Sequence, residues 1–263
     1  MVHVVITGGS SGIGLAVAHQ YLKRAARVTL IGRSQERLEA AKALLVTETG
    51  RSADQICIVS LDVADDAAVK AALSAVEADV GPCDILVTSA GMVAPAPFDA
   101  LSGAEFRRHV DTNLHGTVHV ISAVYPGMKA RGRGRIMIVS SGAGLIGLHG
   151  YTAYCASKSA LVGFAEALRV ESRGHGIDVS ICFPPDTDTP QLAEELKLRP
   201  PEAVAMMGSA GRWSAEAVAR RILKGLDRGQ AEIFFTPSLY LLARFGGVAK
   251  PWIYRWFHRR QRR

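Results

Sequence analysis

Two side chains that could exchange protons lie four residues apart near the middle of the chain. Tyr154 and Lys158 belong to the run Tyr-Thr-Ala-Tyr-Cys-Ala-Ser-Lys over residues 151–158, and helical spacing of apolar residues follows it. Side chains at i and i+4 share one face of a helix. Because an ammonium favours phenolate, Lys158 is expected to pull the pKa of Tyr154 down from about 10. The pair is a candidate acid–base device, although such a pair alone often only covers a solvated helix face.

A glycine-rich turn follows the first apolar run of the chain. Glycines there allow positive φ and let the backbone approach a pyrophosphate, while the next helix offers N–H donors at its N-terminus. The spacing differs from the usual GxGxxG, but the place between a strand and a helix is the one that a dinucleotide site needs. The predicted nucleotide contacts in this turn are Gly8, Ser10, Ser11, Gly12, Ile13 and Gly14.

The end of the second predicted strand indicates which dinucleotide is bound. A carboxylate there holds the ribose 2′-OH of NAD, whereas an arginine accommodates the 2′-phosphate of NADP. This chain has Gly-Arg-Ser over residues 32–34, with Arg37 one helical turn after Arg33. The sequence therefore favours NADPH/NADP+. Further cofactor contacts are predicted after later strands, at Asp62, Val63, Ala90, Gly91, Pro184, Thr187 and Thr189.

Two more polar residues are candidates for the chemistry. Asn113 lies within a long helical pattern, where an asparagine usually costs stability, so an orienting role is plausible. Ser141 follows the fifth predicted strand, thirteen residues before Tyr154, and Ser140 is the alternative if the register differs by one.

Short apolar segments alternate with helical patterns along the chain. Strands are predicted at residues 4–6, 28–31, 56–59, 85–88, 136–139, 179–183 and 232–235. Helices are predicted at residues 12–24, 35–47, 65–78, 104–130 and 214–226, besides the one near Tyr154. The alternation predicts an α/β fold, a doubly wound Rossmann-type parallel sheet with helices on both faces, over residues 1–236.

Composition narrows the class of protein. With 263 residues and 48% hydrophobic content, the chain can bury a large single core. Its four cysteines have no metal-ligand spacing, so neither a metal site nor a disulfide framework is predicted. Because the glycine turn begins at Gly8, a signal peptide has no room, and we expect a cytoplasmic protein.

The formal net charge of +7 comes from the C-terminal segment, residues 237–263. Outside it the chain carries 24 basic and 24 acidic residues, which argues against a nucleic-acid partner. Arg244 and Lys250 interrupt the apolar pattern too early for a membrane span. Trp252 and Trp256 recur at helical spacing before a run of arginines, which indicates peripheral contact with an anionic membrane through residues 239–263. Packing against a partner subunit is the alternative.

The glycine pattern Gly8-xxx-Gly12-x-Gly14, together with Asn113, Ser141 and Tyr154-xxx-Lys158 in this order, resembles the short-chain dehydrogenase/reductase family over residues 2–236. The resemblance implies that Tyr154 exchanges a proton with the substrate oxygen. It implies that Lys158 lowers the tyrosine pKa and holds the nicotinamide ribose, that Ser141 polarises the carbonyl, and that Asn113 orients a water. It also implies a homo-oligomer. One departure is Thr-Ser-Ala-Gly over residues 88–91, where the family commonly has Asn-Asn-Ala-Gly.

Within the family, Pro-Pro-Asp-Thr-Asp-Thr-Pro over residues 184–190 resembles the 3-ketodihydrosphingosine (3-dehydrosphinganine) reductases, as do Arg33 and residues 150–154. The resemblance implies NADPH-dependent reduction of a long-chain amino ketone to dihydrosphingosine in sphingolipid synthesis. It implies a substrate lid at residues 190–212, where Glu194 or Glu195 could pair with the substrate ammonium. The alternatives are a reductase of another apolar carbonyl (a steroid, a retinoid or a 3-oxoacyl thioester) and a nucleotide-sensing or lipid-binding protein without turnover.

Overall fold

The computed structural model describes residues 1–207 and 211–261, so residues 208–210 of the predicted lid and 262–263 of the predicted tail lie outside it. Its centre is a seven-stranded parallel sheet in the order β3-β2-β1-β4-β5-β6-β9. The strands are β1 (His3–Thr7), β2 (Arg27–Gly32), β3 (Ile56–Ser60), β4 (Ile85–Thr88), β5 (Gly134–Val139), β6 (Ile177–Phe183) and β9 (Glu232–Phe234). The prediction of a Rossmann-type sheet is confirmed.

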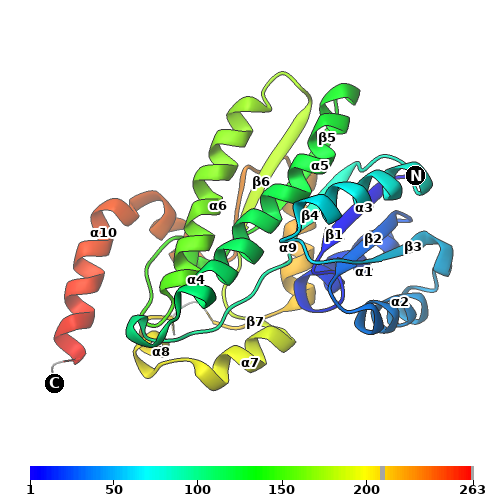
Figure 1. Ribbon diagram of the computed structural model, residues 1–263. Coiled ribbons are helices and arrows are strands. Elements are labelled where there is room, and N and C mark those ends of the chain that lie inside the picture. The colour runs from blue at the N-terminus through cyan, green and yellow to red at the C-terminus, as the bar shows by residue number, and fades with distance from the viewer. Residues whose placement is uncertain (208–210, 262–263) are drawn as a thin grey trace.

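Helices cover both faces of this sheet, as Figure 1 shows. One face packs against α1 (Gly12–Lys23), α2 (Gln35–Thr49) and α9 (Ala215–Asp227). The other packs against α3 (Asp66–Asp79), α5 (Gly116–Arg131) and α6 (Thr152–Glu171). Every residue of β1 and β4 is buried, which explains the apolar runs at residues 4–6 and 85–87, because a strand between two helical layers has no solvent face.

The chain reverses its direction of travel across the sheet between β1 and β4. From β1 it proceeds outward to β2 and β3, and it then returns to β4 on the opposite side of β1. In open parallel sheets a ligand binds outside the carboxyl ends of the strands at such a switch point. The turns after β1, β4 and β5 are therefore the expected floor of a site.

The long helix predicted over residues 104–130 is interrupted. It consists of α4 (Gly103–Val110), a π-helical turn, η3 (Asp111–His115), and α5. Asn113 lies in this turn and is fully buried. A π-helical turn inserts one extra residue into the helical ladder and is often found at functional sites.

The segment between β6 and α9 contains elements that the strand–helix alternation did not predict. These are β7 (Thr187–Asp188), which pairs in parallel with β8 (Trp213–Ser214), and the helices α7 (Pro190–Leu198) and α8 (Pro201–Met207). α10 (Pro237–Gln261) begins directly after the predicted domain boundary and forms an arm at one end of the molecule (Figure 1). Within the described residues, no helix is both long and apolar enough to cross a bilayer.

Candidate active site

The turn between β1 and α1 brings the backbone to one end of a cavity of about 1150 Å³. Gly8 and Gly12 have φ of +66° and +55°, which side chains rarely tolerate. A Cβ on Gly14 would lie 2.4 Å from the Gly8 carbonyl oxygen, and a Cβ on Gly8 would lie 2.8 Å from the carbonyl oxygen of Ser89. Because both approaches are closer than van der Waals contact, the turn depends on glycine at these positions.

Two arginines lie at the nucleotide end of the cavity without neutralising partners. Arg33 and Arg37 are exposed and line it, and neither forms an ion pair within the described part of the chain. Arg37 donates a hydrogen bond to the Ser11 hydroxyl at 3.2 Å, so it lies against the glycine turn. The end of β2 therefore offers two positive charges and no carboxylate, a donor set that fits a phosphate on the ribose.

The other predicted nucleotide contacts, except Gly14, line the same cavity: Ser10, Ile13, Asp62, Val63, Ala90, Gly91, Pro184, Thr187 and Thr189. The hydroxyl of Thr7 accepts hydrogen bonds from the main-chain N–H groups of Ser89 and Ala90, at 3.1 and 3.0 Å. These bonds hold the turn after β4 in place, although this chain has Thr88 and Ser89 where the family commonly has two asparagines. Thr189 caps α7 and lies against Gly12, so the loop after β6 reaches the glycine turn.

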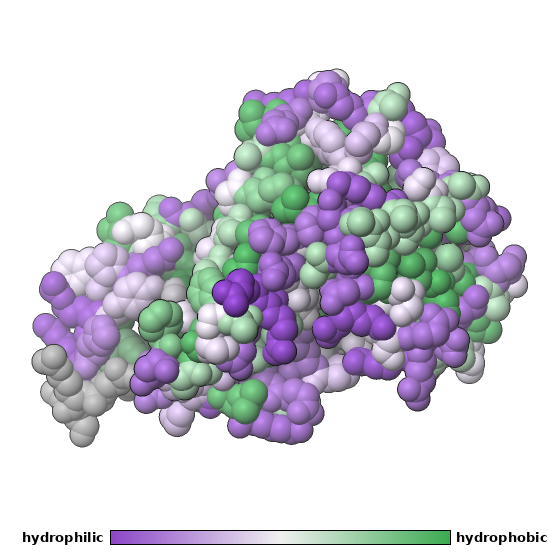
Figure 2. Space-filling model, in the orientation of Figure 1, coloured by the Kyte–Doolittle hydropathy of each residue, from purple (hydrophilic) through white to green (hydrophobic). Residues whose placement is uncertain are grey.

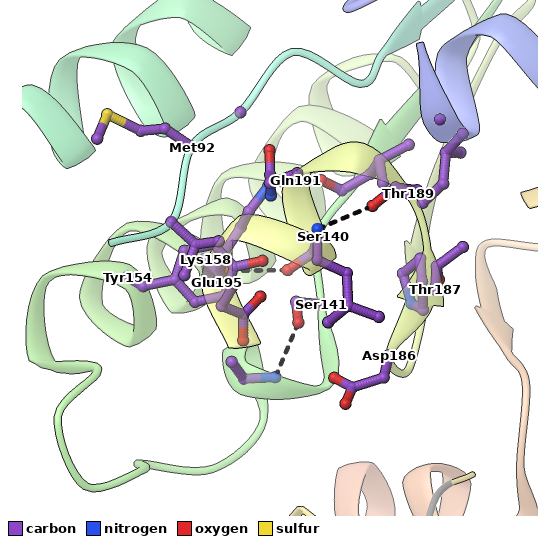
Figure 3. A pocket seen from close by; sticks show the side chains of 18 of the residues that line it. Met92, Ser140, Ser141, Tyr154, Lys158, Asp186, Thr187, Thr189, Gln191 and Glu195 are labelled. Carbon is purple, nitrogen blue, oxygen red and sulfur yellow. Dashed lines mark hydrogen bonds between the residues drawn. The ribbon is translucent and has the colours of Figure 1, made fainter. Parts of the chain in front are cut away.

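Tyr154 and Lys158 project from α6 into the cavity (Figure 3). The Lys158 ammonium lies 5.8 Å from the centroid of the Tyr154 ring and donates a hydrogen bond to the Val139 carbonyl oxygen at 3.0 Å. Burial lowers the pKa of Lys158 to about 8. Burial also raises the pKa of Tyr154 above its usual value of 10, against a lowering effect of its hydrogen bond with Ser141.

The expected lowering of the Tyr154 pKa by Lys158 is therefore wrong for this structure. Desolvation disfavours the charged forms of both side chains, and for Tyr154 this effect outweighs any attraction to the ammonium. At neutral pH Tyr154 is a phenol, the form that can donate a proton, and Lys158 is mostly an ammonium.

The two serines after β5 have different partners. Ser140 is buried and donates its hydroxyl hydrogen bond to the main-chain oxygen of Lys158 at 3.0 Å. Ser141 interacts with Tyr154 and lowers its pKa, and its hydroxyl accepts a hydrogen bond from the Ala143 N–H at 3.2 Å. Of the two predicted registers, it is Ser141 whose hydroxyl lies beside the phenol.

Asn113 lies behind the cavity wall and not on it. Its side-chain oxygen accepts from the Met92 N–H at 2.8 Å, and its side-chain nitrogen donates to the Met92 carbonyl oxygen and the Ser157 hydroxyl. All the side-chain hydrogen bonds thus go to protein groups. They fasten the chain after β4 to α6 at Ser157, the residue directly before Lys158.

Sequence reasoning missed a buried polar network on the substrate side. Arg199 donates to both Asp186 oxygens at 2.6 and 3.0 Å, to Glu195 Oε1 at 2.6 Å and to the Tyr151 hydroxyl at 3.2 Å. Tyr151 in turn donates to Glu195 Oε1 at 2.7 Å. Burial would lower the pKa of Arg199, but its hydrogen bonds to the two carboxylates raise it. The i,i+4 spacing of Glu195 and Arg199 was the available signal.

α10 closes the apolar part of the cavity. The Tyr254 hydroxyl accepts a hydrogen bond from the Gly147 N–H at 3.0 Å, which fastens the helix to the loop before α6. Apolar side chains from this loop, α8 and α10 line this part of the cavity: Ile146, Leu148, Met206, Met207, Trp252, Ile253 and Phe257. The cavity therefore joins a polar nucleotide end, a Tyr-Ser-Lys cluster and an apolar end. Among the residues that the structure describes, no group of three or more His, Cys, Asp or Glu side chains could hold a metal ion.

Comparison with known proteins agrees with this arrangement. Residues 2–199 match the family described as short chain dehydrogenase. The chain is 39% identical over 242 residues to 3-dehydrosphinganine reductase of Danio rerio, covering 92% of this chain and 73% of that one. It is 42% identical over 231 residues to 3-dehydrosphinganine reductase TSC10B of Arabidopsis thaliana, covering 87% and 68%.

A solved structure shares the architecture. The closed form of serine dehydrogenase complexed with NADP+ matches with a TM-score of 0.77 and 26% identity, over 90% of this chain and 95% of that one. Because the family match covers about three quarters of the chain and the relatives cover more, the chain belongs to the short-chain dehydrogenase/reductase family of oxidoreductases.

Proposed function

We propose that the protein reduces 3-ketodihydrosphingosine to dihydrosphingosine with NADPH, as a step of sphingolipid synthesis. The observation that carries the proposal is the Tyr154, Ser141 and Lys158 cluster between a nucleotide end and an apolar end of one cavity. Similarity to proteins named 3-dehydrosphinganine reductase supports the choice of substrate. A long-chain amino ketone has a polar head that can reach the cluster and an alkyl chain that needs the apolar end.

The nucleotide end fits NADPH on its own geometry. Gly8, Gly12 and Gly14 leave space that a Cβ would fill, so a pyrophosphate can approach the main chain at the start of α1. Arg33 and Arg37 would hold the 2′-phosphate, because no carboxylate of the described residues forms an ion pair with either of them. When bound, NADPH supplies the hydride that adds to the keto carbon.

Tyr154 is the proposed proton donor. Its raised pKa keeps the phenol protonated at neutral pH, so it can give the proton to the substrate oxygen as negative charge develops there. The Ser141 hydroxyl, which lines the same cavity and interacts with the phenol, would hydrogen-bond that oxygen as well. The Lys158 ammonium would stabilise the tyrosinate left behind and return a proton to it.

Asn113 would act through the main chain and not through its amide. Its side chain is engaged by Met92 and Ser157, and it keeps Gly91 close to the Lys158 ammonium: a Cβ on Gly91 would lie 3.5 Å from Lys158 Nζ. We infer that a relay water would be held by backbone groups of the π-helical turn.

α10 is the proposed contact with an anionic membrane, at its cytoplasmic face. Five exposed apolar side chains recur at helical spacing and form the apolar stripe of α10: Leu241, Phe245, Val248, Trp252 and Trp256. Arg255 lies 5.5 Å from the Trp252 ring, and Arg259 is exposed beyond the C-terminal end of the stripe. Figure 2 shows polar and apolar side chains interspersed over this arm. Aromatic and basic residues on one helix match the interface of an anionic bilayer.

The membrane contact can be tested by sedimentation with vesicles. We expect binding to phosphatidylglycerol-containing vesicles, less binding to phosphatidylcholine alone, and loss of binding in the Trp252→Ser/Trp256→Ser variant. Val170→Ser, which changes an exposed apolar residue near the end of α6, should bind like the wild type. Concentration-dependent dimers that disappear with the same double substitution, without vesicle binding, would show instead that the stripe contacts a second copy.

The reaction can be tested by following NADPH absorbance with purified protein. The substrates are 3-ketosphinganine in micelles, a steroid ketone and a 3-oxoacyl thioester, with NADH in parallel. We expect rapid oxidation of NADPH with 3-ketosphinganine only. Turnover of only one of the other ketones would show that the protein reduces a different apolar carbonyl. Nucleotide binding without any turnover would favour a nucleotide-sensing or lipid-binding protein.

A further inference from the structure

The polar network of Tyr151, Asp186, Glu195 and Arg199 has a charge imbalance inside the substrate side of the cavity. Two carboxylates share one guanidinium, so the group carries a net charge of about −1. The Arg199 side chain is 5% exposed and the Glu195 side chain 11%. A nearly buried excess charge lowers stability unless a counterion neutralises it.

The excess charge has a free acceptor at Glu195. Its Oε1 accepts from both Tyr151 and Arg199, whereas Oε2 has no hydrogen-bond partner among the described residues. Both oxygens of Asp186 are used by Arg199. Glu195 lines the cavity and is drawn on the side of Tyr154 in Figure 3. Oε2 is therefore the remaining strong acceptor of the network.

Glu195 also lies close to the phenol that is proposed to donate the proton. The rings of Tyr151 and Tyr154 are 6.2 Å apart, and Tyr151 holds Glu195 directly. In addition to burial, the negative charge of Glu195 raises the pKa of Tyr154, which is an electrostatic sign of the same proximity. A group bound by Glu195 would thus lie next to the reacting carbonyl.

The proposed substrate places a positive charge at that position. In a 2-amino-3-ketone the carbon that bears the ammonium is bonded to the carbonyl carbon, so a carbonyl at Tyr154 brings the ammonium near Glu195. We propose that Glu195 Oε2 binds the substrate ammonium, with Arg199 and Tyr151 as positioning residues, and thereby selects 2-amino ketones over plain ketones. This inference rests on the proposed function and decides between the two glutamates considered from the sequence.

The neighbouring Glu194 also lines the cavity, but it has neither the burial nor the free oxygen of Glu195. Glu194 is 73% exposed and pairs with Lys197 through both of its oxygens, at 2.7 Å each. A solvated, paired carboxylate contributes little to binding. Glu194 is therefore a matched control on the same helix.

The test compares two ketones and two variants. Glu195→Gln keeps an oxygen for Tyr151 and Arg199 but removes the charge. We expect kcat/KM for 3-ketosphinganine to fall about 10- to 100-fold, mainly through KM, because a hydrogen bond between charged groups is lost. With the chain-matched 1-hydroxy-3-ketone that lacks the amino group, the variant should resemble the wild type. Glu194→Gln should resemble the wild type with both ketones.

The outcomes separate this inference from the proposed function. If Glu195→Gln loses the same factor with both ketones, Glu195 only supports the fold of α7 and the inference is wrong. A wild type that reduces both ketones equally well also overturns it, even if the variant fails to fold. If the wild type reduces the 1-hydroxy-3-ketone but not 3-ketosphinganine, the proposed function itself fails.

Discussion

The two ends of the cavity are constructed in different ways. The nucleotide end depends on main-chain conformation within residues 8–14, where two glycines have positive φ and a third lies against a carbonyl oxygen. The substrate end depends on side chains brought together from distant segments: Tyr151 and Glu195 are 44 residues apart, and Gly147 and Tyr254 are 107 apart. A local turn keeps its geometry when other residues change, whereas a long-range cluster can change with each contributing segment.

The two ends of the cavity therefore have separate tasks in the proposed reaction: one binds the nucleotide, and the other holds and selects the ketone. The glycine turn and the arginines offer contacts to any NADP-linked reaction. Within the described part of the chain, no hydrogen bond or ion pair joins them to the network of Tyr151, Asp186, Glu195 and Arg199. Residues of α7, α8 and α10, the helices that line the other end, are the ones that would contact the ketone of the proposed reaction. We therefore expect substitutions at one end to leave the properties of the other end unchanged.

The largest effect is expected at the phenol. Tyr154→Phe removes the proposed proton donor, so kcat should fall about 10³-fold, while NADPH affinity should stay as in the wild type. Single-turnover kinetics and nucleotide titration by fluorescence measure the two properties separately. Tyr125→Phe, which removes a hydroxyl bonded to Ser172 away from the cavity, is the matched control. A Tyr154→Phe variant with near wild-type turnover would show that another group donates the proton.

The converse effect is expected at the glycine turn. In Gly14→Ala the new Cβ would meet the Gly8 carbonyl oxygen at 2.4 Å, so the main chain of the turn must move. A misplacement of about 1 Å can lower the rate of an enzyme about 100-fold. We expect the Kd for NADPH to rise by a similar factor. Gly163→Ala on α6, where a Cβ meets nothing within 4 Å, should leave the Kd unchanged. Equal Kd values for the two variants would contradict the backbone argument.

The fold was predictable because its signals are local. Each buried strand is a short apolar run, and each covering helix has its own periodicity, so the seven strands were found to within a few residues. The π-helical turn was not found, because Asn113 is held there by Met92 and Ser157 and not by its neighbours in sequence. Periodicity cannot report a contact between the turn after β4 and α6.

The site was predictable to the same extent. The glycine turn, Ser141, Tyr154 and Lys158 follow strand ends or helical spacing, and all but Gly14 of the predicted turn line the cavity. For the Arg199 network the i,i+4 spacing of Glu195 and Arg199 was a weak signal, because an arginine before a proline at the end of a short helix is typical of a surface charge. The contacts of Arg199 with Tyr151 and Asp186 lie outside that helix and have no such signal. The pKa of Tyr154 was expected to change in the opposite direction, because burial cannot be read from the spacing of two residues.

A smaller effect is expected from the arginines after β2. Arg33→Ser/Arg37→Ser should raise the KM for NADPH about 10- to 100-fold through lost charged hydrogen bonds, with little change for NADH. The preference between NADPH and NADH measures this directly, at fixed saturating ketone. Arg220→Ser, at an exposed position of α9, is the control. If the KM values for NADPH and NADH rise equally, the arginines contact a part of the nucleotide that both cofactors share.

The smallest expected effect is on stability, and it links Lys158 to pH. Because burial lowers its pKa from 10.5 to about 8, the unfolded chain holds more protons than the folded one between these values, and this group makes stability rise with pH there. Below pH 8 the buried charge costs stability. At pH 7 the free energy of unfolding of Lys158→Met should therefore exceed that of the wild type by about 1–3 kcal/mol, and its melting temperature should be higher. The variant should also lose activity. The difference should shrink as pH rises from 8 toward 10.5. Lys70→Met, at an exposed lysine paired with Asp66, should show no such pH dependence. A Lys158→Met variant that is less stable at pH 7 would mean that the hydrogen bond to Val139 outweighs the cost of burying the charge. Lys158 would then stabilise the fold.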